Sequence, residues 1–354
     1  MAIRDRWAAL LLWGAVLAAG LAAPSFLSGY ALSLLGRFLA LGLVTVGVVW
    51  TWGYGGILSL GQGVFFGLGG YALAMHLKLE SLGSDPLPDF MVWNGLAHLP
   101  WWWAPFRSPG FALAMVVVLP GVAAALLGVL LFRRRVSGVY VSLITQALAL
   151  AFSLLLISQQ GLTGGFNGLT NFSTLFGLPL ASSAAQRTLY WVTVLCLAGA
   201  LAGSHRLLTT GVGRLLVAIR DSENRIRFLG YDPVPSKVFA FTLGAVLAGI
   251  GGALFTLHVG VISPAMVGVV PSIEMVIWAA AGGRDRLLGA VAATVAGNLV
   301  KDWVSSAVPE LWLYVMGGLF VAVATVRWPS VREIALRWPG HVPRAVLGEE
   351  VADA

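Results

Sequence analysis

Glu274 is the residue of this chain whose type and place most directly point to chemistry. It is a carboxylate inside an apolar stretch, 272–283, that reads as part of a membrane protein. Acids at membrane depth are costly and commonly serve ion or solute pathways. A structural interpretation stands beside this one: Pro271 and Ser272 predict a helix start, and a helix dipole favours negative charge in the first turn. The sequence leaves both interpretations open.

The segment 53–71, GYGGILSLGQGVFFGLGGY, holds too many glycines for a plain lipid-facing helix. Gly63 and Gly67 form a GxxxG pair, which allows close helix packing. The alternative is a broken helix whose freed backbone groups line a polar pathway together with Ser59 and Gln62. Irregular backbone at membrane depth is tolerated only against protein or a water-filled cavity.

Other polar residues could meet a small solute. In the tract 161–171, Asn167 and Thr170 are either hydrogen-bonding partners of a solute or turn residues. Gln146 lies within an apolar stretch and suits an interhelical hydrogen bond or a solute contact. Arg37 is expected to snorkel or to pair with an acid. The predicted substrate-pathway residues are Ser59, Gln62, Gln146, Asn167, Thr170 and Glu274.

Motifs for independent catalysis are missing from the sequence. None of the three lysines, Lys78, Lys237 and Lys301, sits in a phosphate-binding loop, and there is neither an HExxH motif nor a Gly-x-Ser-x-Gly elbow. The single cysteine, Cys196, excludes an internal disulfide and a cysteine metal cluster. The sequence therefore predicts a non-enzyme with no catalytic residue, metal or cofactor of its own. Energy for active transport would come from another subunit or an ion gradient.

The charged run 211–233, GVGRLLVAIRDSENRIRFLGYDP, is patterned as an amphipathic helix. Acids precede bases by four residues twice within it, and each such pair stabilises a helix by about 0.2–0.5 kcal/mol. Gly230 and Pro233 supply the stop. A basic helix between membrane spans suits docking to a soluble partner. The predicted docking residues are Arg220, Asp221, Glu223, Arg225 and Arg227.

The composition predicts an all-α polytopic membrane protein. The 354 residues are 58% hydrophobic and 10% charged, with a mean hydropathy of +0.87, whereas soluble domains carry about 25% charge. About ten spans are expected, some broken or half-spanning, and the eighth is too short to cross as a regular helix. They are 7–27, 31–51, 56–77, 111–132, 137–158, 188–208, 237–258, 272–283, 287–304 and 312–327.

Charge sets the expected orientation. Starting inside and alternating places most lysines and arginines in inner loops, so both termini are predicted to be cytoplasmic. The net charge of +7 then reflects membrane topology rather than nucleic-acid binding. The stretch 7–27 could be a cleaved signal peptide, but its length favours a retained span. The predicted organisation is an N-terminal span at 1–30, a transmembrane domain at 31–329 with the docking helix at about 211–231, and a basic, polar tail at 330–354.

Several segments resemble ABC permeases of the branched-chain amino acid (LivM) type, across roughly 40–329. They include WGYGGILSLGQGVFFGLGGYALAM and AIRDSENRIRFLGYDP. LPDFM, ITQAL and PELWL are similar to the urea ABC transporter permeases of the UrtC type. One departure is GGRDRLLGA, where Asp285 and Arg286 replace a small, neutral pair common in the family.

The resemblance implies a multi-pass subunit of the bacterial inner membrane, surrounded by lipid, that forms half of a translocation pathway. Its implied partners are a second homologous permease, two ATP-binding subunits that bind the ATP, and a periplasmic solute-binding protein. The implied function is ATP-driven import of urea and short amides, and the alternative substrate is a branched-chain or hydrophobic amino acid. The polar tract 161–171 and the absence of a second charge expected at membrane depth to hold a zwitterion favour urea.

Two other classes of protein compete with an ATP-driven importer. An ATP-independent channel or secondary transporter could use Glu274 as a proton relay, but the docking helix at 211–231 argues against it. An integral membrane enzyme has no catalytic constellation in its support.

Overall fold

The computed structural model describes residues 20–82, 87–180 and 182–308, with 314–315, 317–319 and 321–322 near the C-terminal end. The first and last predicted spans and both terminal segments lie wholly or largely outside the described residues. Within the described part, seven helical stretches are long and apolar enough to cross a membrane. The prediction of an all-α, multi-pass membrane protein is therefore confirmed.

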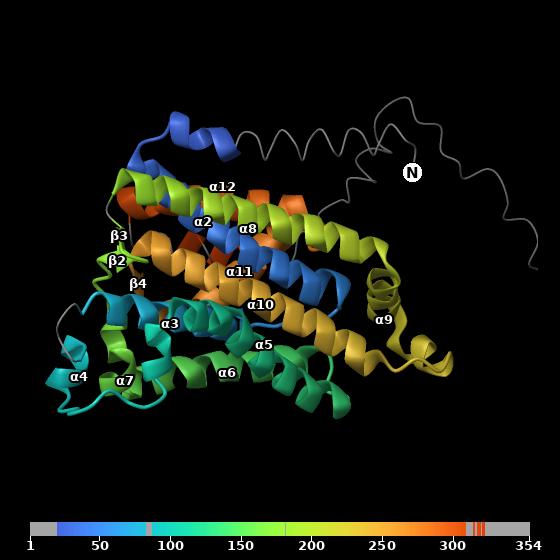
Figure 1. Ribbon diagram of the computed structural model, residues 1–354. Coiled ribbons are helices and arrows are strands. Elements are labelled where there is room, and N and C mark those ends of the chain that lie inside the picture. The colour runs from blue at the N-terminus through green and yellow to red at the C-terminus, as the bar shows by residue number, and fades with distance from the viewer. Residues whose placement is uncertain are drawn as a thin grey trace, which may run out of the picture.

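Most of the helices run side by side along one axis (Figure 1). The short helix α9 lies at one end of this bundle, and α4, α7 and the small strands lie at the other end. The helices are α2 (Gly29–Val48), α3 (Gln62–Glu80), α4 (Asp89–Trp93), α5 (Pro109–Arg133), α6 (Val139–Ser158), α7 (Gln160–Thr163), α8 (Ser183–Thr209), α9 (Gly211–Phe228), α10 (Pro233–Val259), α11 (Val269–Ala281) and α12 (Leu287–Ala307).

Helix α10 is the centre of the bundle and packs against α2, α3 and α5. Glycines allow the close approach between α3 and α10: a Cβ at Gly69 would lie 2.1 Å from the carbonyl oxygen of Gly249, and one at Gly252 would lie 1.9 Å from that of Phe66. In lipid the hydrophobic effect does not drive helices together. Small residues at the interface let the backbones approach closely, so that van der Waals packing holds the helices together. The close packing predicted for the glycine-rich segment is present.

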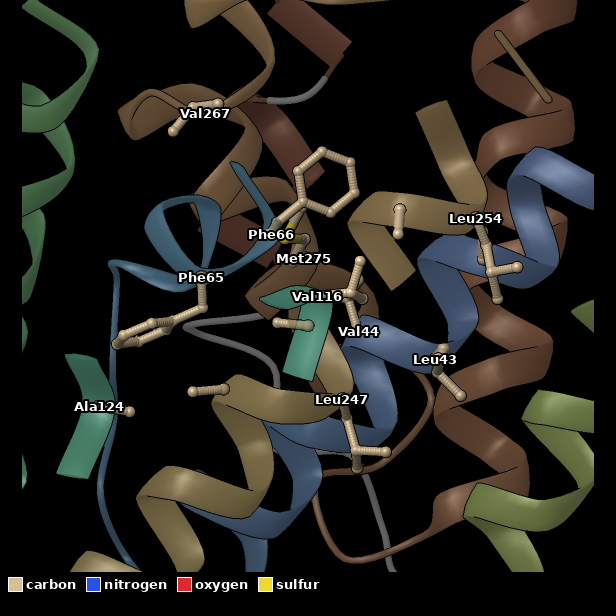
Figure 2. Close-up of a cluster of buried hydrophobic side chains, with 14 of the residues drawn as sticks. Leu43, Val44, Phe65, Phe66, Val116, Ala124, Leu247, Leu254, Val267 and Met275 are labelled. Carbon is tan, nitrogen blue, oxygen red and sulfur yellow. The ribbon is translucent and has the colours of Figure 1, made fainter. Parts of the chain in front are cut away.

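Large apolar side chains fill the spaces between these helices. Val44 of α2, Phe65 of α3, Val116 of α5 and Leu247 of α10 belong to one buried cluster (Figure 2). The outer faces of α5 and α6 expose further leucines, among them Leu126, Leu130 and Leu154. Apolar residues on an outward face are stable against lipid, so this side of the bundle suits the acyl chains.

The chain between α2 and α3 is broken, as one of the two interpretations of segment 53–71 expected. Helix α2 continues into a π-helical turn, η2 (Val49–Tyr54), and an irregular stretch follows before α3 begins at Gln62. Gly56 in this stretch has a φ of +68°, a conformation that suits glycine. The span predicted at 56–77 therefore starts six residues later than expected.

Helix α11 has 13 residues, or about 20 Å of regular helix. This is shorter than the hydrocarbon core of about 30 Å, as predicted for the eighth element. Only together with the turn before it, as Pro264–Ala281, is it one of the seven membrane-length stretches. A 3₁₀ turn, η5 (Pro264–Met266), precedes it. Strands β1 (Leu169–Thr170) and β4 (Val261–Ile262) pair antiparallel near α11, and β2 (Thr174–Leu175) pairs with β3 (Leu178–Pro179).

Candidate functional site

A cavity of about 430 Å³ lies between α2, α11 and α12, with part of its wall from α3 and α10. We call it the membrane cavity. Its lining combines charged and polar groups with large apolar side chains. The charged and polar members are Arg37, Thr45, Glu274, Thr294, Asn298, Lys301 and Asp302, and the apolar ones include Phe38, Leu41, Phe66, Phe255, Met275 and Trp278.

Two ion pairs join the helices around the membrane cavity. The Nζ of Lys301 lies 2.7 Å from both carboxylate oxygens of Glu274, which ties α12 to α11. The Nη2 of Arg37 lies 2.6 Å from Oδ1 of Asp302, which ties α12 to α2. All four side chains keep some exposure, from 14% for Glu274 to 38% for Asp302. The pairs are therefore accessible to a solute within the cavity.

A polar contact between α2 and α12 lies at one end of the membrane cavity. The hydroxyl oxygens of Thr45 and Thr294 lie 2.8 Å apart. The Asn298 amide donates to the carbonyl of Thr294 at 2.8 Å, one turn further along α12. Both threonine side chains are buried, so the cavity is closed by packed side chains at this end.

Of the four charged residues in the cavity, only Glu274 was predicted from the sequence to line a substrate pathway. Glu274 lines the cavity, but the capping interpretation is wrong: α11 begins at Val269, so Glu274 lies beyond its first turn. Arg37 pairs, as one of its two interpretations expected. The expectation that no second charge lies at membrane depth is also wrong, because Lys301 and Asp302 lie inside a predicted span and complete the set. Their adjacent charges in that span were the signal.

Ser59 and Gln62 lie elsewhere, at the break before α3, where both are buried. Neighbouring side chains satisfy the freed backbone groups there: the amide of Leu60 donates to Thr145 of α6, and the amide of Gly63 donates to Ser272 of α11. Among the described residues, the side-chain amide of Gln62 has no hydrogen-bond partner. The break is thus packed against protein rather than open to the membrane cavity.

The remaining predicted pathway residues are scattered. Gln146 is half-buried on α6 and does not line the membrane cavity. Asn167 is exposed in a 3₁₀ turn, and the carbonyl of Thr170 accepts a hydrogen bond from Lys78. Three glycines with positive φ, at 164, 165 and 168, surround Asn167, which favours the turn interpretation of this tract.

At the opposite end of the bundle from α4 and the strands, α9 contacts the broken end of α2. The Nη1 of Arg220 donates to the carbonyl of Gly53 at 2.7 Å, and its Nε contacts Asp221 at 2.9 Å. A Cβ at Gly53 would lie 1.7 Å from the carbonyl oxygen of Arg284. The Tyr54 hydroxyl donates to the carbonyl of Asp285 at 2.8 Å. We call this meeting of α9, η2 and the 283–286 turn the α9 joint.

Glu223 links the second half of α9 to α10 at this joint. It accepts hydrogen bonds from Lys237 and, at 2.8 Å, from Arg227. Burial by itself would raise the pKa of Glu223, but the hydrogen bonds from Lys237 and Arg227 outweigh it and hold that pKa below its ordinary value. The predicted helix is present but kinked, because Ser222 has non-helical angles (φ −160°, ψ 86°).

The end of α9 presents a surface beyond the bundle. Phe228, Leu229 and Tyr231 are exposed there, and Arg225 and Asp221 are exposed along the helix. Exposed aromatic residues beside charged ones are typical of protein–protein contacts. Among the described residues, no group of three or more His, Cys, Asp and Glu side chains could hold a metal ion.

Comparisons with known proteins identify the family of this chain. Residues 30–324 match the family of the branched-chain amino acid transport system permease component. The chain is also similar to the high-affinity branched-chain amino acid transport system permease protein LivM of Salmonella typhimurium and of Escherichia coli K12. Each is 27% identical over 295 residues, covering 76% of this chain and 62% of the relative. The chain thus spans less than two thirds of the length of these relatives. No solved structure matches it.

The family match covers most of a chain that folds into a bundle of membrane-length helices. This protein is therefore a multi-pass membrane permease that belongs to the family of branched-chain amino acid transport system permease components.

Proposed function

We propose that this chain is the permease subunit of an ATP-driven importer for branched-chain or other hydrophobic amino acids. The observation that carries the substrate class is the lining of the membrane cavity, which places charges of both signs beside an apolar wall. An amino acid of this class has the matching three features: a positive ammonium group, a negative carboxylate and an apolar side chain. The names of the similar proteins, which are branched-chain amino acid transport permeases, support the same substrate.

Urea is the second candidate, because the LPDFM, ITQAL and PELWL segments resemble urea transporter permeases. Of the two arguments that favoured it, a membrane interior without a second charge does not hold, because Arg37, Lys301 and Asp302 lie beside Glu274. The other, the polar tract 161–171, is a glycine-rich turn away from the membrane cavity. Urea is neutral and needs only hydrogen-bond partners. The cavity charges therefore favour the amino acid.

In the proposed transporter, a second homologous permease completes the pathway and a periplasmic solute-binding protein delivers the substrate. The chain would lie in a bacterial inner membrane. Two ATP-binding subunits would bind the ATP and contact α9, where Arg220, Asp221, Glu223, Arg225 and Arg227 lie on or beside the α9 joint. Their movement would change which side of the membrane the pathway faces, by stabilising one of two states over the other.

The test is uptake of labelled leucine and labelled urea, side by side, into vesicles that carry this chain with its partner subunits. Leucine uptake that requires ATP and that excess urea does not reduce is the expected result. ATP-dependent urea uptake without leucine uptake would replace the substrate and keep the transporter class. Flux that persists without ATP would move the protein to the channel or secondary-transporter class.

A further inference from the structure

The membrane cavity lies between helices of membrane-spanning length. Lys301 follows Leu287, the first residue of α12, by 14 positions, which corresponds to about 21 Å along the helix axis. The 283–286 turn before α12 belongs to the α9 joint, at one end of the bundle. Lys301 lies six positions, about 9 Å, before the last residue of α12, and Arg37 lies eight positions, about 12 Å, after the first residue of α2. Both ion pairs therefore lie within the length of the membrane-spanning helices, nearer the end of the bundle that carries the strands (Figure 1).

Charged side chains at this depth face protein or water, because exposure to lipid is costly. The four cavity charges are partly exposed on the face formed by α2, α11 and α12. The outer faces of α5 and α6, by contrast, expose leucines. The charged face is therefore the one that lines an aqueous pathway or meets a second permease.

The polar residues of α12 form one stripe along this face. They recur at steps of three and four residues, the spacing of one helix face. The face beside it is apolar, with Val300 and Trp303 exposed. On α2, Arg37 and Thr45 lie opposite at the same helical spacing. The stripe comprises Thr294, Asn298, Lys301, Asp302 and Ser305, and all five residues line the membrane cavity.

We propose that the membrane cavity is the solute-binding site of this permease and that it holds an amino acid as a zwitterion, an inference that rests on the proposed function. Arg37 receives the carboxylate, because its guanidinium presents two parallel donors to a carboxylate. Glu274 receives the ammonium group. The apolar side chain packs against Phe66 and Phe255, whose rings lie edge to face 5.4 Å apart.

Exchange of ion pairs explains why a zwitterion fits this cavity. Arg37 is paired with Asp302 and Lys301 with Glu274, so each base has an acid beside it. A ligand with one charge of each sign lets each pair open onto a ligand charge without leaving an uncompensated charge at membrane depth. A ligand with a single charge can engage only one of the two pairs. The volume of about 430 Å³ falls within the range of about 300–1,000 Å³ that is usual for small-molecule sites.

The experiment is equilibrium binding to the assembled transporter in lipid nanodiscs, without the solute-binding protein and without ATP. Four labelled probes are compared: leucine, 4-methylpentanoate, which lacks the ammonium group, 3-methylbutylamine, which lacks the carboxylate, and urea. We expect leucine to bind saturably and each half-molecule to bind about tenfold to a hundredfold more weakly, since each lacks one charge-assisted contact. Absence of saturable leucine binding, or equal binding of leucine and either half-molecule, would overturn the assignment.

Two cavity variants separate binding from folding. The exchange Glu274→Lys with Lys301→Glu keeps an ion pair between α11 and α12 but reverses its direction. We expect it to restore the yield lost in Glu274→Lys alone and not to restore leucine binding. Arg37→Gln should weaken leucine binding while leaving 3-methylbutylamine binding unchanged. Asp89→Asn, an acid-to-amide change at the exposed start of α4, is the matched control and should bind leucine like wild type.

The outcomes distinguish this inference from the proposed function. Normal leucine binding in the exchanged pair would refute the site while ATP-dependent leucine uptake by wild type keeps the function. Uptake of urea alone by wild type would refute the function itself.

Discussion

The membrane cavity and the α9 joint both hold several acid–base contacts, but their helices are joined in different ways. In the cavity, side-chain ion pairs join α12 to α2 and α11, as Arg37–Asp302 and Lys301–Glu274. At the joint, Arg220 donates a hydrogen bond to the backbone carbonyl of Gly53, and the backbone at Gly53 lies against that of Arg284. Side-chain partners can be exchanged for a solute, whereas backbone contacts move only with their helices. The difference suits one region to binding and the other to transmitting motion.

The largest expected effect is at the backbone contact of the joint. Gly53→Ala would place its Cβ 1.7 Å from the carbonyl oxygen of Arg284, which requires the 283–286 turn to move. We expect a loss of about 3 kcal/mol or more in the free energy of unfolding, at the upper end for overpacking. Thermal unfolding in detergent measures it. Gly199→Ala, at an open helical position on α8, is the control and should be neutral or slightly stabilising. Equal melting temperatures for the two variants would contradict the close contact.

The next effect concerns the cavity and should spare the fold. Glu274→Gln keeps the size of the side chain and one oxygen that can accept from Lys301, so we expect a folded protein. At matched expression we expect about tenfold less leucine uptake, the loss of one hydrogen bond to a charged group. Initial uptake rates at matched expression measure this, with Asp89→Asn as the control. Normal uptake by Glu274→Gln would remove the cavity from the pathway and leave the ion pair as a structural contact.

A third prediction addresses transmission through α9. Changing Arg220 and Asp221 together to Gln and Asn removes the bond to the Gly53 carbonyl. We expect reduced co-purification of the ATP-binding subunits and severalfold lower uptake per ATP hydrolysed. Arg187→Gln, at an exposed position near the start of α8 and away from α9, is the control for lost charge. If the ATP-binding subunits co-purify unchanged and transport remains coupled in the double variant, α9 is not the coupling element.

The smallest effect is the pH dependence of the α9–α10 contact. The pKa of Glu223 is held below its ordinary value of 4.5, so its contribution to stability is fully present above that value and is lost as the pH falls through the lowered pKa. We expect amide hydrogen exchange in α9 to accelerate below about pH 4.5, after correction for intrinsic rates. Glu223→Gln should show no such step. A step of equal size in the variant would assign it to another group.

Sequence periodicity and charge were sufficient for much of the fold. The spans predicted at 111–132, 137–158 and 237–258 became α5, α6 and α10 with shifts of a few residues, because apolar composition over a membrane thickness leaves a helix as the structure that satisfies every backbone group. The break after Gly53 had a local signal in its glycines. The exact start of α3 did not, since neighbouring side chains on α6 and α11 decide where the freed amides find partners.

The site divides in the same way. By itself the sequence determined that Glu274 is a costly acid inside a span and that 211–231 is a charged amphipathic helix, because both follow from residue types at local spacing. Only the tertiary structure decided that Arg37, Lys301 and Asp302 share a cavity with Glu274, while Ser59, Gln62, Gln146, Asn167 and Thr170 do not. Arg37 and Asp302 are 265 positions apart in the chain. Their pairing depends on how α2 and α12 pack against each other, and no local pattern encodes that contact.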